Sequence, residues 1–131
     1  MTTGWADAVR RGDLAAVRAQ LAAGADIDAR DAHGQTALMN AARDGQAALV
    51  HLLTENGADL NHHAKYGLTA VMIAVIRGHP EVVRILVEAG ADLTPRGTGA
   101  PGFSGKTAED LARERGDDTM IRLLRVDRPD P

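Results

Sequence analysis

Gly34-Gln35-Thr36-Ala37-Leu38 opens a segment that Gly57-Ala58-Asp59-Leu60-Asn61 closes, and the rest of the chain repeats this segment. A shift of thirty-three residues toward the C-terminus places its closing triplet on Gly90-Ala91-Asp92, and the same shift toward the N-terminus places it on Gly24-Ala25-Asp26. Self-similarity at such a period is the sequence signature of a solenoid, in which each unit packs only on its neighbours.

The composition fits one globular domain built from thin helical layers. The chain has 131 residues, of which 44% are hydrophobic and 25% are charged, so it is long enough and apolar enough for a single core. Only 2% of the residues are aromatic, so the core must consist of Leu, Val, Ile and Ala.

Charge and cysteine content exclude several classes of protein. The net charge of −3 argues against general attraction to nucleic acid, and the absence of Cys excludes disulfides and thiolate chemistry. The N-terminal residues lack the basic and apolar pattern of a signal peptide, and no apolar run could span a bilayer. We therefore expect a cytoplasmic protein that binds neither nucleic acid nor membrane.

Within each copy, two helices are expected. Thr36 is a plausible N-cap for a short inner helix, and Gly45 allows the chain to reverse after it. Leu49, Val50, Leu52 and Leu53 give the outer helix its apolar face. The fourth copy is five residues longer than the period, and the extra residues lie within 97–104. We expect one domain with an N-terminal cap unit over 3–30, full units over 31–63 and 64–96, an extended loop tip over 97–104, a C-terminal cap unit over 105–125 and a frayed tail over 126–131.

The pattern of Gly-x-Thr-Ala-Leu, an Ala-Ala pair, a mid-unit Gly and a closing Gly-Ala-Asp resembles the ankyrin repeat, over roughly Thr3 to Arg125. The resemblance implies an all-α repeat solenoid, in which helix-turn-helix units linked by β-hairpin-like loops stack into a curved array. The family's Thr-Pro-Leu-His opening stands here without its Pro and His, so packing of Met39 and Met72 must replace the hydrogen bonds of that His. Ala64 replaces the Asp of the hairpin turn, which is expected to weaken that hairpin.

The resemblance also implies a non-catalytic module that binds a protein through its hairpin tips and the exposed side of its inner helices. Tyr66, Leu68 and Ile76 are expected to face solvent there, and Tyr is a favoured contact residue at interfaces, although single exposed apolar residues are common. Phe103, in the extended tip, either anchors a partner or folds back onto the last unit. The candidate contact residues are His33, Gln35, Asn40, Arg43, Lys65, Tyr66, Leu68, Ile73, Ile76, Arg77, Phe103 and Arg115.

A ladder of arginines precedes the mid-unit glycines: Arg11, Arg43, Arg77 and Arg115. A basic stripe would suit a partner rich in carboxylates. The alternative, which we favour at this point, is that each cation offsets the negative end of its helix dipole by about 0.3–1 kcal/mol.

No residue pattern predicts catalysis, a cofactor or a metal. His62 and His63 are adjacent and cannot share a helical face, so we expect them on a hairpin edge that faces water. The repeated Asp26, Asp59 and Asp92 are expected to cap backbone N–H groups. The expected protein is a monomeric adaptor, inhibitor or regulatory subunit with an unidentified protein partner. Self-association through Phe103 and the apolar groove, and a small ligand or metal at His62, His63 or the extended tip, remain alternatives.

Overall fold

The computed structural model describes residues 2–99 and 102–126. This part of the chain contains eight α-helices and no β-strand, apart from one isolated bridge between Gly97 and Ser104. The helices are α1 (Thr3–Arg11), α2 (Leu14–Ala22), α3 (Ala37–Arg43), α4 (Ala47–Glu55), α5 (Ala70–Arg77), α6 (Pro80–Glu88), α7 (Ala108–Arg115) and α8 (Asp118–Val126).

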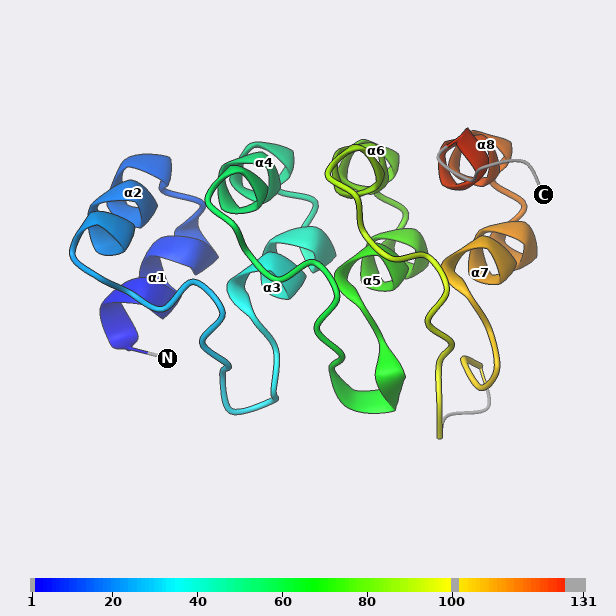
Figure 1. The fold of residues 1–131 in the computed structure, drawn as a ribbon, viewed down its shortest axis with the longest axis horizontal. Coiled ribbons are helices and arrows are strands. Elements are labelled where there is room, and N and C mark those ends of the chain that lie inside the picture. Colours follow the sequence, from blue (N-terminus) through cyan, green and yellow to red (C-terminus); the bar gives the residue numbers. More distant parts are fainter. Residues whose placement is uncertain (1, 100–101, 127–131) are drawn as a thin grey trace.

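The helices form two layers (Figure 1). The short helices α1, α3, α5 and α7 make an inner layer, and α2, α4, α6 and α8 make an outer layer above it. The loops that lead from each outer helix to the next inner helix project away from both layers (Figure 1). The expected all-α repeat stack is therefore confirmed.

Threonine and glycine set the limits of the inner helices, as the sequence predicts. The buried hydroxyls of Thr36, Thr69 and Thr107 each accept a hydrogen bond from the N–H three residues later, at 3.3, 3.4 and 3.2 Å. Such a bond satisfies one of the N–H groups that a helix leaves unpaired at its start. Pro80, which has no N–H, occupies the first turn of α6, where it costs no hydrogen bond.

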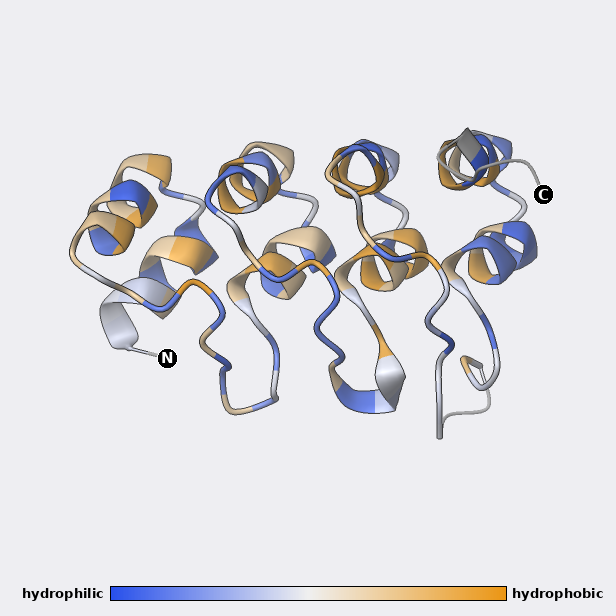
Figure 2. Cartoon of the chain, viewed as in Figure 1, coloured by the Kyte–Doolittle hydropathy of each residue, from blue (hydrophilic) through white to orange (hydrophobic). Residues whose placement is uncertain are grey.

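Small and flexible side chains let the inner helices approach one another. Ala41, Ala74 and Ala112 have no exposed surface, and Met39 and Met72 are each 1% exposed. The two methionines occupy the positions of the family's histidine, and they are packed in the core instead of forming its hydrogen bonds. Figure 2 shows most of the hydrophobic colour on the helices, with mostly hydrophilic loops below them.

Hydrogen bonds between units add to this packing. Asp28 Oδ1 accepts from the N–H of Asp59, and Asn61 Oδ1 accepts from the N–H of Asp92, both at 2.8 Å. His79 Nε2 donates to the carbonyl of Arg43 at 3.0 Å. The predicted role of the repeated aspartates is confirmed, because Asp26, Asp59 and Asp92 each accept from the N–H two residues later.

The division of the chain into units at 3–30, 31–63, 64–96 and 105–125 stays our proposal, and below these segments are called units one to four. Residues 100–101 of the expected loop tip and residues 127–131 of the expected tail lie outside the described residues. Among the helices of the described part, none has the length and apolarity needed to cross a membrane.

Candidate functional site

Seven of the candidate contact residues fall into two groups on the side of the inner layer and its loops, and the other five lie on or beside α5 and on α7. The first group lines a groove of about 590 Å³ between α1 and α3. It brings together His33, Asn40 and Arg43, with Gln35 bonded to Arg43 beside them. The groove is lined by Thr3, Ala6, Asp7, Val9, Arg10, Asp31, His33, Asn40, Arg43 and Asp44.

Several polar groups of this groove already have partners within the chain, although the buried Asn40 Oδ1 has none among the described residues. Arg43 Nη1 donates to Gln35 Oε1 at 3.0 Å, and Arg43 Nε lies 3.4 Å from Asp44 Oδ1. Asn40 Nδ2 donates to Asp31 Oδ2 at 3.2 Å. These bonds leave the surface of unit two largely satisfied without a ligand.

Asp31 holds the hairpin at the base of this groove. Its Oδ1 accepts from the N–H groups of His33 at 2.8 Å and Gln35 at 3.0 Å. Partial burial by itself raises the pKa of Asp31, but the hydrogen bonds from Gln35, Asn40 and His33, together with the charge of His33, lower the pKa below its ordinary value. The carboxylate is therefore ionised at neutral pH and keeps its acceptor role.

The second group, which we call the tip cluster, consists of Lys65, Tyr66, Thr98, Gly99 and Phe103. The Tyr66 and Phe103 rings lie with their centroids 6.2 Å apart and tilted by 43°, and Lys65 Nζ lies 5.0 Å from the centre of the Tyr66 ring. The N–H of Thr98 donates to the carbonyl of Tyr66 at 2.7 Å. Tyr66 is 38% exposed, so its ring is both held in place and accessible.

The backbone of Tyr66 is left-handed, with φ 65°, and no other non-glycine residue in the described part of the chain has a positive φ. The hairpin that starts at Ala64 has the same two backbone hydrogen bonds as the hairpin that starts at Asp31. The N–H of Ala64 donates to the carbonyl of Leu68 at 2.9 Å, and the N–H of Gly67 donates to the carbonyl of Ala64 at 3.1 Å. Ala64 supplies no side-chain acceptor, so this hairpin lacks the two caps that Asp31 provides.

The arginine ladder divides into two pairs. Arg11 and Arg43 lie within ion-pair distance of Asp7 and Asp44. Arg115 Nη1 donates to the carbonyl of Ile76 at 3.2 Å, across the end of α5, and neither Arg77 nor Arg115 has a carboxylate partner among the described residues. All four lie in the last turn of an inner helix, as the dipole interpretation requires.

Three expectations about exposure are corrected. Ile73 is only 7% exposed and belongs to the core, so its expected position on the open surface is wrong. Leu68 and Ile76 are half-buried against the core and do not project freely into solvent. His62 is half-buried as well, because its Nε2 donates to the carbonyl of Gly34 at 3.1 Å, whereas His63 is exposed as expected.

Phe103 folds back onto its own chain, which was one of the two interpretations of this residue. It is half-buried and packs against the core as well as against Tyr66. Thr98 and Gly99 were missed in the sequence, although the five extra residues that precede Gly105 marked this loop as unusual.

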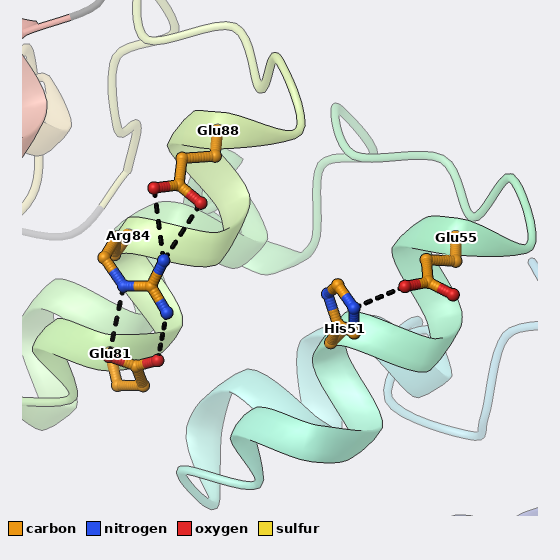
Figure 3. A network of polar contacts seen from close by, with 5 residues as sticks. All are labelled: His51, Glu55, Glu81, Arg84 and Glu88. Carbon is orange, nitrogen blue, oxygen red and sulfur yellow. Dashed lines mark hydrogen bonds and ion pairs between the residues drawn. The ribbon is translucent and has the colours of Figure 1, made fainter.

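The outer face carries a separate polar network (Figure 3). Arg84 lies between Glu81 and Glu88 on α6, and His51 contacts Glu55 on α4, beside a hollow of about 590 Å³. Hydrogen bonds from Arg84 lower the pKa of Glu81. These pairs are exposed, so each contributes little to stability. No group of three or more His, Cys, Asp or Glu residues in the described part could hold a metal ion.

Comparison with known proteins agrees with this geometry. A search of curated proteins gave no match to the chain. The family model for ankyrin repeats, with three copies of the repeat, matches residues 5–96. This match covers most of the chain, including the inner and outer helices of the first three pairs and the hairpin of Tyr66. The chain therefore belongs to the ankyrin repeat family.

Proposed function

We propose that the chain is a non-catalytic binding module that recognises a protein partner through its hairpin tips and inner helices, as a cytoplasmic adaptor, inhibitor or regulatory subunit. Ankyrin repeats are general protein–protein interaction modules. The observation that carries the proposal is Tyr66, a large, accessible ring held rigidly by the neighbouring loop. Rigid aromatic anchors of this kind contribute disproportionately to binding energy at interfaces.

Affinity capture from the lysate of the native host, with mass spectrometry, tests the proposal. The intact chain is compared with Tyr66→Ala and with Gln35→Ala/Arg43→Ala, which alter the two groups of contact residues separately. His51→Ala, on the outer face, is the matched control. We expect a protein that the intact chain and the control retain and that at least one of the other variants loses.

Circular dichroism spectra of all four proteins should agree, because each substituted side chain is at least partly exposed. Loss of the captured protein with His51→Ala alone would place the interface on the outer face. Capture of no protein by the intact chain would contradict the proposal.

Self-association finds less support. Phe103, its expected contact, already packs against Tyr66 and the core of its own chain. A native mass that stays monomeric at high concentration would exclude this alternative.

A further inference from the structure

Unit three differs from unit two in the charge of its tip and inner helix. The stretch 64–78, which holds the hairpin and α5, contains no Asp or Glu, and its only charged residues are Lys65 and Arg77. The equivalent stretch of unit two, 31–45, contains Asp31, Arg43 and Asp44. An acidic chain thus contains one segment that presents only positive charge.

The difference extends to each polar contact of unit two. Gln35 and Arg43, which are bonded to each other, are replaced thirty-three residues later by Leu68 and Ile76. Asp44, the partner of Arg43, is replaced by Arg77. In unit two, Gln35, Arg43 and Asp44 bond to one another, whereas unit three presents two half-buried apolar side chains beside a cation.

Three cations lie along unit three without a carboxylate partner in the described part of the chain, one at its hairpin and two at the end of α5. Lys65 contacts the Tyr66 ring. Arg115 donates to the carbonyl of Ile76 at the end of α5, and Arg77, the next residue in the chain, is exposed. None of the three lies within ion-pair distance of an Asp or Glu in the described residues. Neighbouring cations do pair with carboxylates of unit four, since Lys106 contacts Glu114 and Arg96 lies 3.9 Å from Asp110.

The tip cluster supplies the apolar part of the same surface. Gly99 lies against the Tyr66 ring, where an added Cβ would come within 3.4 Å of Cδ1. Phe103, from the same loop as Gly99, also contacts the ring. A ring fixed in this way loses little conformational entropy when a ligand side chain packs on it.

We propose that this surface binds an acidic segment of the protein partner. Carboxylates of the segment pair with Lys65, Arg77 and Arg115, and an apolar side chain between them packs on Tyr66, Leu68 and Ile76. The inference rests on the proposed function and names the chemistry of its partner. A protein segment fits better than nucleic acid, because the apolar strip requires an apolar side chain. The net charge of −3 opposes both ligands, but it repels a segment with a few carboxylates less than a polyanion.

The first experiment selects phage-displayed random peptides of about 12 residues on the intact chain. Such a peptide spans roughly 40 Å when extended, at about 3.3 Å per residue. We expect the selected peptides to share Asp or Glu residues around an aromatic or aliphatic residue. Selection of no peptide, or of peptides without an acidic excess, would overturn the proposal.

Fluorescence anisotropy with the best selected peptide then tests the site. Arg77→Asp introduces the residue that unit two has at this position, and we expect affinity to fall by about tenfold or more. Arg122→Asp, at an exposed position of α8, makes the same change in net charge and should leave affinity nearly unchanged. Lys65→Ala, which copies Ala32 of unit two, gives an independent second variant on the loop.

If Arg77→Asp and Arg122→Asp lowered the affinity for the peptide equally, the loss would come from the change in net charge, and the proposed site would be wrong. A single-stranded oligonucleotide that competes as well as the peptide would show general attraction to polyanions and overturn it too. If a protein captured by the intact chain is lost with Gln35→Ala/Arg43→Ala but retained by Arg77→Asp, the binding function stands and this inference fails.

Discussion

Single residues of this chain are held in conformations that their neighbours in the stack determine. Tyr66 adopts φ 65° because the adjoining loop donates a hydrogen bond to its carbonyl and packs on its ring. A left-handed conformation costs an L-residue roughly 1–2 kcal/mol, so these contacts must offset that cost. The strain lies at the residue on which the proposed function depends, as is common at binding sites.

Replacing Tyr66 separates the strain from the ring contacts. Tyr66→Gly and Tyr66→Ala both remove the ring, but only glycine adopts a positive φ freely, so we expect the Gly variant to be the more stable by about 0.5–1 kcal/mol. At Ala64, with φ −90°, a change to Gly should instead destabilise. Urea unfolding of the three variants measures both differences, and a Tyr66→Ala variant as stable as Tyr66→Gly would contradict the strain.

Asp31 makes the stability of the second hairpin depend on pH. Its pKa is lower in the folded chain than the ordinary value of about 3.9, so its contribution is complete above that pH and is lost as the pH falls through the folded pKa. Asp31→Ala removes three hydrogen bonds and should cost about 1–2 kcal/mol at pH 7, since the site is partly solvated.

Urea unfolding from pH 7 to pH 3 checks this prediction. The stability difference between the native chain and Asp31→Ala should stay constant down to about pH 4 and shrink below it. Asp31→Asn keeps an acceptor without a titratable group, so it serves as the control. A difference that widens in acid would show that the carboxyl is not stabilised in its ionised form.

At the level of the helices, the sequence predicted two helices in each unit but not which loops meet. Thr36 was identified as an N-cap because it acts through a bond three residues away, and Thr69 and Thr107 cap their helices in the same way. The burial of Ile73 was missed because register alone does not show how closely the neighbouring helices α3 and α7 pack against α5. The contact of Tyr66 with Gly99 and Phe103 lies in a loop that breaks the period, so no repeat alignment could place it.

Helix ends in one unit are covered by side chains of the next. Gly45 follows Asp44, the C-cap of the inner helix of unit two, with φ 71°, and an added Cβ would lie 2.7 Å from the His79 ring. Gly116, the equivalent residue of unit four, has φ 72° and open space around it. Gly116→Ala should therefore cost about 1–2 kcal/mol for the backbone alone, and Gly45→Ala should cost more because His79 must also move.

A double-mutant cycle isolates the contribution of the contact. In a His79→Ala background, Gly45→Ala should cost about as much as Gly116→Ala does in the native chain, because only the backbone cost remains. Chemical unfolding supplies the four free energies. An unchanged cost of Gly45→Ala after removal of His79 would mean that the ring does not constrain this helix end.

Across the whole molecule, stability is distributed unevenly between the two ends of the stack. In a solenoid, each unit is stabilised by its own packing and by its neighbours, so an end unit has support from one side only. At the N-terminal end, α2 has Val17 as its one fully buried side chain, whereas α6 buries Val82, Val83, Ile85, Leu86 and Val87. At the C-terminal end, α8 still buries Met120 and Leu124 completely.

The N-terminal outer helix should therefore open first. Local opening free energies follow buried apolar contact, so amides of Leu14–Ala22 should exchange with deuterium fastest among the helices, those of Asp118–Val126 more slowly, and those of Pro80–Glu88 slowest. Peptide-resolved hydrogen exchange at neutral pH measures this order, with α4 as an internal reference because it packs between two outer helices. Uniform exchange across α2, α6 and α8 would instead mean that the four units open together. The chain would then unfold as one cooperative block, and the surfaces of units two and three would be equally rigid.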